Sequence, residues 1–255
     1  MRFLITNDDG ILAPGLAALH EAASALGPAD VVAPEDTQSA IGHAISVLQP
    51  MVVRRLHVNN QFHGWSVGGR PADCVKLAMI ELLPERPDVV LSGINAGANA
   101  GINVLYSGTI AGAREGALFG VPAIAFSLEL CDELDFGAAG RVARSVLEAI
   151  LAARPPAGIC LSVNIPRMDR GLPRGVKCCA QAAVNWEEFY EKRVDPEGHA
   201  VYWLDGRIPH DRAHPDSDLA ALHDGYVTIT PLRADLTDQA ALDAIASWRW
   251  PHKFG

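Results

Sequence analysis

The stretch Phe3-Leu4-Ile5-Thr6-Asn7-Asp8-Asp9-Gly10 places two acids directly behind an apolar run, and Pro14 follows shortly after it. Because side chains alternate along a strand, neighbouring carboxylates converge only where the chain has left the strand and begun to turn. Gly10 allows such a turn, and Pro14 suits the first position of a helix. The stretch therefore predicts two acids in a loop at the carboxyl end of a strand, where ligand sites lie in open α/β sheets.

Asp8 and Asp9 repel one another in such a loop. Two like charges held close together raise each other's pKa unless a cation lies between them. Hard divalent ions such as Mg²⁺, Mn²⁺ and Ca²⁺ bind carboxylate oxygens for this reason. The alternative interpretation is that both residues are helix-capping and surface acids without a ligand.

The rest of the chain alternates strands with helices. A strand over 2–6, a helix over 15–26 and a strand over 30–33 form a βαβ unit, so the two strands are expected to be parallel. Further strands are predicted over 88–92, 121–127, 158–163 and 226–230, helices over 71–83, 110–119, 136–153 and 236–247, and a hairpin over 51–58 and 61–67 with its turn at Asn59-Asn60. This order predicts an α/β fold with a mostly parallel sheet flanked by helices.

The composition limits the classes of partner. The 255 residues include 21 basic and 30 acidic side chains, a formal net charge of −9, which argues against general affinity for nucleic acid or anionic membranes. No apolar run reaches the ~20 residues that span a bilayer, and the first residues lack the pattern of a signal peptide. Five cysteines without metal-finger spacing indicate reduced thiols, with a disulfide or metal site at Cys178-Cys179 as the alternative. We expect a soluble, cytoplasmic protein that binds neither a membrane nor a nucleic-acid polymer.

A second polar stretch, residues 92–101, carries glycines at 93, 97 and 101 and asparagines at 95 and 99. Small residues let the backbone approach a ligand, and Asn supplies both an acceptor and donors. Because the stretch follows a core strand, it is predicted to belong to the site, with a flexible surface loop as the alternative. Ser39 lies in the turn-rich segment 35–43 at the same sheet edge, although a loop Ser usually makes only local hydrogen bonds.

Ser107-Gly108-Thr109 directly precedes the helix predicted over 110–119. Free backbone amides at a helix start, with the helix dipole behind them, bind anions. The same residues fit an ordinary Ser/Thr N-cap equally well.

Beyond residue 165 the pattern changes. Residues 185–205 are rich in aromatic side chains with charges between them, and Asp195-Pro196-Glu197-Gly198 marks a turn. We expect an extended hairpin arm, on which aromatic side chains are more typical of an oligomer contact than of nucleic-acid binding. The predicted organisation is a catalytic core over 1–165 and a C-terminal region over 166–255 that is not an independent domain.

Several segments, taken together and in their order along the chain, resemble the family of the stationary-phase survival protein SurE, whose members are metal-dependent nucleotidases. These segments are ITNDDGILAPGL (5–16), GRPADCVKLA (69–78), SGINAGANAGINVLYSGTIAGAREGALFGVPAIAFS (92–127), VNIP (163–166) and GYVTITPLRADLT (225–237). The likeness covers nearly the whole length. It implies a Rossmann-like core and hydrolysis of nucleoside 5′- and 3′-monophosphates, in some members with short polyphosphate as well. It also implies homodimers or homotetramers joined through a swapped C-terminal arm.

The resemblance further implies one divalent metal ion per subunit, for which we expect Mg²⁺ or Mn²⁺, bound by Asp8, Asp9, Ser39 and Asn95. It implies phosphate contacts from Asn99, Ser107, Gly108 and Thr109. The chain departs from the family pattern at Ala40, where Gly often follows the metal-binding Ser, and at Glu197, where a basic residue is common.

We therefore predict hydrolysis of a phosphomonoester by a metal-activated water, with Asp8, Asp9 and Asn95 as catalytic residues. Amides of Gly108 and Thr109 and the Asn99 side chain are expected to hold phosphate oxygens. A general acid is not assigned, and the candidates by residue type are His43, His214 and Asp218. The alternatives are a metal-dependent nucleoside N-glycosidase, which has no need of a phosphate-binding turn, and a non-catalytic nucleotide or phosphate sensor.

Overall fold

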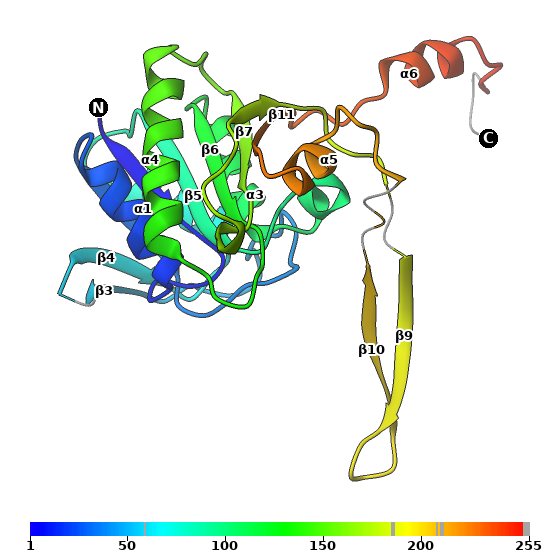
Figure 1. Ribbon diagram of the computed structural model, residues 1–255, viewed down its shortest axis with the longest axis horizontal. Coiled ribbons are helices and arrows are strands. Elements are labelled where there is room, and N and C mark those ends of the chain that lie inside the picture. The colour runs from blue at the N-terminus through cyan, green and yellow to red at the C-terminus, as the bar shows by residue number, and fades with distance from the viewer. Residues whose placement is uncertain (59, 185–186, 208, 210–211, 252–255) are drawn as a thin grey trace.

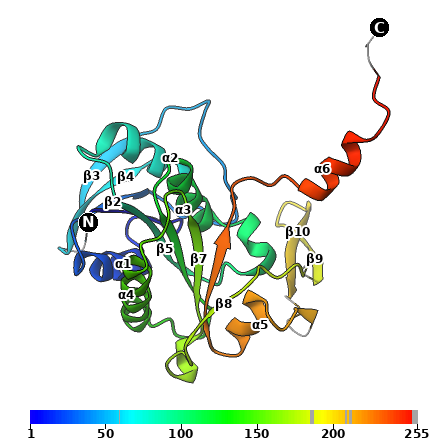
Figure 2. The ribbon, with the colours of Figure 1, turned by 90° about the horizontal axis from the view of Figure 1, so that it is seen from above.

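The computed structural model describes residues 1–58, 60–184, 187–207, 209 and 212–251. Its core is one sheet between two layers of helices (Figures 1 and 2). The strands of this sheet are β1 (Phe3–Thr6), β2 (Ala29–Pro34), β3 (Val53–Val58), β4 (Phe62–Val67), β5 (Val89–Ala96), β6 (Ala123–Leu128), β7 (Cys160–Ile165), β8 (Val176–Cys178) and β11 (Val227–Leu232). Within the described residues they lie in the order β3-β4-β2-β1-β5-β6-β7-β11-β8.

The middle of the sheet is parallel. Neighbours from β4 through β2, β1, β5 and β6 to β7 pair in parallel, whereas β3 and β11 pair antiparallel with β4 and β7. The predicted α/β class with a mostly parallel sheet is therefore confirmed. Because parallel strands end at the same edge, the segments that follow β1, β2, β5 and β6 converge there.

Helices cover both faces of the sheet. Helices α1 (Pro14–Ser24) and α4 (Phe136–Ala152) pack on one face, and α2 (Pro71–Leu77) and α3 (Gly108–Leu118) pack on the other (Figure 2). Buried apolar side chains fill each interface, with Leu16 and Leu147 on the first face and Val75 and Ile110 on the second. Burial of this apolar surface supplies the main favourable term in folding.

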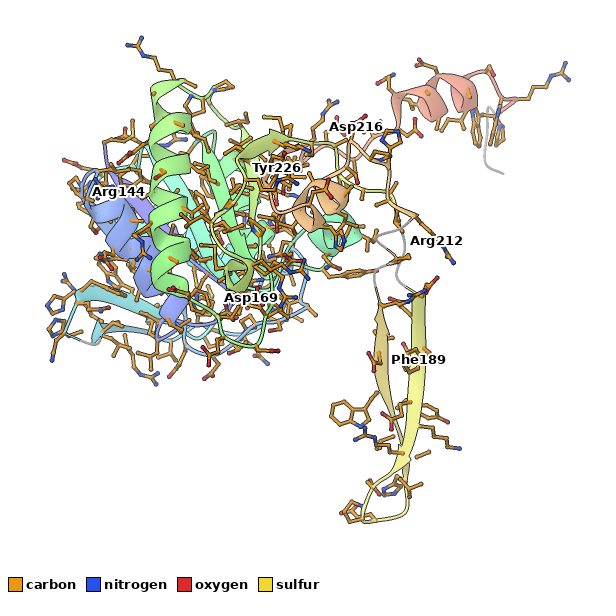
Figure 3. The ribbon with its side chains drawn as sticks, in the orientation of Figure 1. Arg144, Asp169, Phe189, Arg212, Asp216 and Tyr226 are labelled. Atoms are coloured by element: carbon orange, nitrogen blue, oxygen red, sulfur yellow. The ribbon has the colours of Figure 1, made fainter. Side chains whose placement is uncertain are left out.

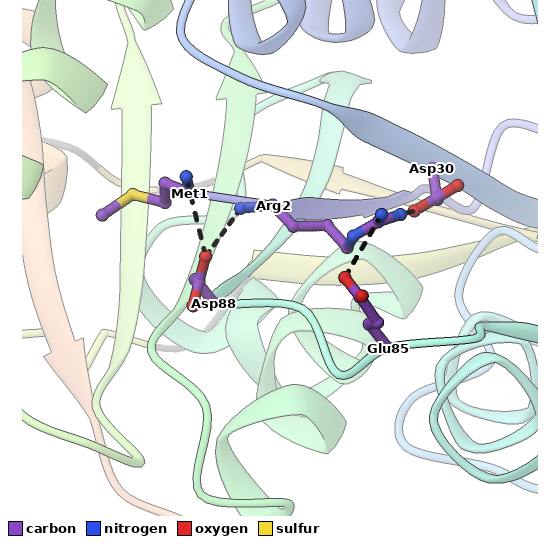
Figure 4. Close-up of polar contacts among 5 residues, drawn as sticks. All are labelled: Met1, Arg2, Asp30, Glu85 and Asp88. Atoms are coloured by element: carbon purple, nitrogen blue, oxygen red, sulfur yellow. Dashed lines mark hydrogen bonds and ion pairs between the residues drawn. The ribbon is translucent and has the colours of Figure 1, made fainter.

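Ion pairs close the amino edge of the sheet (Figure 4). The Arg2 guanidinium lies 2.7 Å from Asp30 Oδ2 and 3.5 Å from Glu85 Oε2. The backbone amide of Arg2 donates to Asp88 Oδ2 at 2.7 Å. Acids at this edge therefore have partners inside the protein, and they tie together the starts of β1, β2 and β5.

Strand β5 is longer than predicted. It runs to Ala96, so Asn95 lies at a strand end, whereas the sequence predicted a loop over 92–101. The cause is continued pairing with β6, whose register shifts between Ser92 and Asn95. Such irregularities are common beside functional sites, where they redirect a side chain.

Other boundaries also differ from the predicted ones. The helix predicted over 71–83 ends as α2 at Leu77 and continues as a wider π turn, η1 (Ala78–Leu82). Strand β8 and helix α5 (Asp218–His223) were not predicted, because such short elements show no clear hydrophobic period. The predicted turn at Asn59-Asn60 lies partly outside the described residues.

The C-terminal region adds strands to the core and then leaves it. Strands β9 (Glu187–Val194) and β10 (Ala200–Arg207) form a separate antiparallel ribbon, the arm, which reaches away from the body (Figure 1). The predicted hairpin is confirmed and runs two residues further than expected. Helix α6 (Gln239–Ala246) also stands clear of the core (Figure 1). All five cysteines are free thiols, and no described helix is long and apolar enough to cross a membrane.

Candidate active site

The turn after β1 presents the two predicted acids at the carboxyl edge. Buried Asn7 closes this turn by donating from Nδ2 to the carbonyl of Gly10 at 2.9 Å. Gly10 has a φ of +98°, a conformation that L side chains rarely adopt. The amide of Gln38 donates to the carbonyl of Asp8 at 2.6 Å, so the loop after β2 is fixed against the acids.

Asp8 is the most buried of the predicted ligands, with 6% of its surface exposed. The Thr109 hydroxyl donates to its Oδ1. Burial raises the pKa of Asp8 to about 6, the charge of Asp9 adds to the rise, and the hydrogen bonds from Thr109 oppose it. The ionised carboxylate therefore carries a desolvation cost that the protein offsets only in part.

Asp9 lies beside it at the surface of the same turn. Its Oδ2 accepts a hydrogen bond from the amide of Ala96 at 3.2 Å. Burial raises the pKa of Asp9 as well, against the effect of this amide. Among the described residues, no basic side chain forms an ion pair with Asp8 or Asp9.

One cleft brings most of the predicted site residues together. It has a volume of about 620 Å³, and the predicted residues that line it are Asp8, Asp9, Ser39, Asn95, Asn99 and Ser107. Asn95 donates from Nδ2 to the carbonyl of Gly97 at 2.7 Å, so its Oδ1 is the atom left for a ligand. The cleft thus gathers carboxylate, hydroxyl and amide oxygens at the ends of β1, β2 and β5.

A buried polar network holds Asn99 at the rim of this cleft. Asn164 in β7 clamps its backbone: Oδ1 accepts from the Asn99 amide at 2.7 Å, and Nδ2 donates to the Asn99 carbonyl at 3.3 Å. The Asn99 side chain donates from Nδ2 to the Ser127 hydroxyl at 2.8 Å. Ser162 also donates to the Asn99 carbonyl, at 3.2 Å. Strand β7 therefore holds the main chain of Asn99, and β6 holds its side chain.

The start of α3 lies directly against Asp8. Ser107 is the N-cap, and its hydroxyl accepts from the amide of Ile110 at 3.0 Å. A Cβ on Gly108 would meet Asp8 Cβ at 2.8 Å, so only glycine allows this approach. Thr109 is fully buried and outside the cleft lining, and its hydroxyl and amide both face Asp8. Thr109 therefore lies next to the Asp8 carboxylate.

The general-acid candidates lie elsewhere. His43 Nε2 lies 2.8 Å from Glu115 Oε2 in α3. Asp218 is buried, and its carboxylate accepts from the amides of Gly101 and Ala182, at 2.9 Å each. His214 is largely exposed. Within the described chain, none of these candidates lines the cleft, and the general acid stays unassigned.

The tip of the arm gathers another group of potential ligands. Side-chain atoms of Asp195, Glu197 and His199 lie within 4.8 Å of one another. Asp195 Oδ1 accepts from the backbone amides of the other two residues, at 2.9 and 2.8 Å. These hydrogen bonds close the hairpin turn, and the group lies outside the cleft.

Some cleft residues were missed from the sequence. Tyr106 and, from the arm, Glu188, Tyr190 and Leu204 line the cleft beside the acids. The sequence interpretation assigned the arm to oligomer contacts, and no local pattern shows which strand face turns toward the core. Asn164 was quoted only as part of a motif, although its position at the end of a core strand was a usable signal.

Known proteins are similar to this chain in sequence and in fold. A family model described as "Survival protein SurE" matches residues 3–188. A protein named 5'-nucleotidase SurE from Syntrophobacter fumaroxidans is 41% identical over 248 residues, covering 97% of this chain and 99% of its own. One with the same name from Desulforudis audaxviator is 44% identical over 253 residues and 97% of both chains. The crystal structure of the SurE protein from Aquifex aeolicus superposes with a TM-score of 0.82 at 36% identity, covering 96% of this chain and 98% of that one.

Proposed function

The chain belongs to the survival protein SurE family, and we propose that it is a divalent-metal-dependent nucleotidase that releases phosphate from nucleoside 5′- and 3′-monophosphates. Relatives that match it over nearly their full length are named 5'-nucleotidase. Short polyphosphate is a further proposed substrate. The observation that carries the proposal is the acid pair Asp8 and Asp9, which lines a cleft and has no basic partner in the described chain.

We propose that Asp8, Asp9, Ser39 and Asn95 hold one divalent ion, Mg²⁺ or Mn²⁺. The donor set fits such an ion, because carboxylate, hydroxyl and amide oxygens are its preferred ligands. The raised pKa of both acids also fits, because a cation favours their ionised forms. When bound, such an ion supplies charge that neutralises a phosphate and lowers the pKa of a water molecule for in-line attack.

The protein's own groups orient the substrate in this proposal. Asn99 has a second amide hydrogen on Nδ2 besides the one given to Ser127, and that hydrogen is available to a phosphate oxygen. Ser107 lies in the cleft at the start of α3, where the positive end of the helix dipole favours an anion. Gly108 allows that helix end to approach, and Thr109 orients the Asp8 carboxylate.

We also propose how the chain is organised and assembled. Residues 166–255 continue the core of residues 1–165 rather than forming an independent domain, which the pairing of β11 with β7 supports. The exposed Phe189 and Trp203 of the arm and Trp248 beyond α6 support a homodimer or homotetramer joined through this region. The free thiols fit a reducing compartment such as the cytoplasm.

A phosphate-release panel tests the proposed activity. The purified protein is incubated with nucleoside 5′- and 3′-monophosphates and with tripolyphosphate, each with Mn²⁺, with Mg²⁺ or with excess chelator. We expect release from the nucleotides with metal and none with chelator. Release of free base without phosphate would indicate an N-glycosidase instead. Tight nucleotide binding without turnover under any metal would indicate a sensor.

A further inference from the structure

The cleft that holds the acid pair also has an apolar part. Tyr106 lines it at the end of the short helix η2 (Gly101–Leu105), and Tyr190 and Leu204 line it from the base of the arm. The volume of about 620 Å³ lies in the range of sites that enclose a small organic molecule. The cleft is therefore larger than a metal ion and a phosphate require.

The geometry of the arm explains which of its side chains enter the cleft. Tyr190 of β9 and Leu204 of β10 are direct cross-strand partners, so their side chains share one face of the ribbon. Glu188, two residues before Tyr190, lies on that face as well. Phe189 lies on the opposite face (labelled in Figure 3) and is not a cleft residue. One face of the arm's base thus forms a wall of the cleft.

The charges of the cleft residues indicate which part of a substrate this wall can bind. The charged side chains that line the cleft are Asp8, Asp9 and Glu188, all acidic. A phosphate dianion therefore gains little from these side chains unless a cation is bound. Tyr190 and Leu204 are 65% and 56% exposed, so covering them with an apolar, flat group is favourable.

We infer that Tyr190 and Leu204 bind the nucleobase of a nucleoside monophosphate whose phosphate lies at the acid pair. This inference deepens the proposed function and rests on it. A nucleotide carries a dianion at one end and a flat aromatic face at the other, which matches the two kinds of surface in the cleft. Because every base has such a face, stacking favours nucleotides over base-free phosphomonoesters without selecting one base.

The test compares a substrate that has a base with one that lacks it. Steady-state phosphate release with Mn²⁺ is measured for AMP and for ribose 5-phosphate, on the unsubstituted protein and on Tyr190→Ala. We expect the KM for AMP to rise about tenfold and the KM for ribose 5-phosphate to stay within about twofold, since alanine removes only the stacking contact. Tyr190→Phe keeps the ring and is expected to retain the KM for AMP.

Tyr202→Ala is the matched control, because Tyr202 lies on the same face of the arm, nearer the tip, and does not line the cleft within the described residues. We expect it to leave both KM values unchanged. An equal rise for both substrates in Tyr190→Ala, or an unchanged KM for AMP, would overturn the inference. So would an effect of Tyr202→Ala as large as that of Tyr190→Ala.

A binding measurement separates this inference from the proposed activity. Adenosine carries the base without a phosphate, so saturation-transfer NMR with chelator present reports the base contact alone. We expect transfer to adenosine from the unsubstituted protein and a clear loss in Tyr190→Ala. No transfer from the unsubstituted protein would overturn the base contact even if phosphate release occurs. A protein that binds adenosine through Tyr190 but releases no phosphate would overturn the proposed activity alone.

Discussion

At the amino edge of the sheet Asp30 lies 2.7 Å from the Arg2 guanidinium, whereas at the carboxyl edge Asp8 and Asp9 form no ion pair within the described residues. Both edges belong to the same parallel strands, and both carry acids next to strand ends. At the amino edge the protein supplies the counter-charge itself, so the acids there are structural. At the carboxyl edge burial raises the pKa of both acids, which fits the proposal that a bound cation supplies their counter-charge.

The largest expected effect comes from removing one charge of the unpaired acids. Asp9→Asn keeps the shape of the side chain but loses a charged ligand, so we expect metal-dependent phosphate release to fall by about 10³-fold or more. Release is measured with Mn²⁺ and Mg²⁺ at saturating nucleotide, and calorimetry reports Mn²⁺ binding, which we expect to be lost in parallel.

Asp30→Asn is the matched control at the other edge. It also removes one carboxylate charge next to a strand, but from a residue paired with Arg2. We expect activity within about twofold of the unsubstituted protein, because this partly buried pair lies at the edge of the sheet opposite the acid pair. Equal losses of activity in Asp9→Asn and Asp30→Asn would contradict the proposed difference between the two edges of the sheet.

The next largest effect is expected at Asn164, which hydrogen-bonds the backbone of Asn99. Asn164→Ala removes both hydrogen bonds to the Asn99 backbone and leaves the buried Asn99 amide without this partner. We expect kcat/KM for nucleotides to fall by about 10- to 100-fold, since the phosphate contact is misplaced while the metal ligands are untouched.

Mn²⁺ affinity measured by calorimetry is the readout that separates positioning from general damage. It is expected to change less than about twofold in Asn164→Ala. Ser162→Ala removes the 3.2 Å hydrogen bond to the same carbonyl and the 3.3 Å one from Asn164 Nδ2, but it leaves Asn164 on the Asn99 backbone, so it is expected to lose less activity. Loss of Mn²⁺ binding in Asn164→Ala would show instead that the whole cleft had collapsed.

Glu115 in α3 sharpens the comparison because it is a buried acid that does have basic partners. Its carboxylate lies 2.6 Å from Lys76 Nζ and 2.8 Å from His43 Nε2. Burial acts to raise the pKa of Glu115, but the hydrogen bonds from His43 and Lys76 outweigh it, so the pKa lies below the ordinary 4.5. The ionised form therefore stabilises the fold above about pH 4.5, and this contribution is lost as the pH falls through the lowered pKa.

We expect Glu115→Gln to lower the free energy of unfolding by about 1–3 kcal/mol at pH 7. Urea unfolding from pH 7 down to pH 3 is the measurement, and the difference between the variant and the unsubstituted protein is expected to shrink below pH 4.5. A difference that stays constant with pH would mean that packing, not the charge, was lost.

The sequence was sufficient to predict where those residues lie whose position depends on the order of the strands. Asp8, Asp9, Ser39 and Asn95 each follow or end a predicted strand, and parallel strands bring their carboxyl ends to one edge. Local periodicity therefore predicted both the fold class and the place where these residues meet. The family resemblance, carried by ordered motifs, supplied the proposed chemistry.

Other parts depended on contacts between distant segments, which periodicity cannot show. That Thr109 contacts phosphate stays a prediction, whereas the hydrogen bond from its hydroxyl to Asp8, 101 positions away, was not predicted. The arm was predicted as a hairpin, yet which of its faces meets the cleft depends on how the ribbon leaves the core. Asn95 was placed in a loop because its glycine neighbours suggested one, whereas pairing with β6 keeps it in a strand.

The smallest expected effect tests the amino edge directly. Arg2→Met removes the guanidinium that pairs with Asp30 and Glu85 but keeps an apolar side chain of similar length. We expect the melting temperature to fall by about 2 °C or less, since ion pairs that remain partly open to water contribute little and the gain is offset by side-chain entropy. The difference should shrink in 1 M salt, which screens surface charges at roughly 3 Å, and phosphate release should stay within about twofold. Arg144→Met, which breaks an exposed pair with Glu148 on α4 (Arg144 is labelled in Figure 3), is the control for loss of any surface charge. A marked loss of activity in folded Arg2→Met, but not in Arg144→Met, would mean that the two edges are coupled through the parallel strands, and the amino edge could then no longer be treated as purely structural.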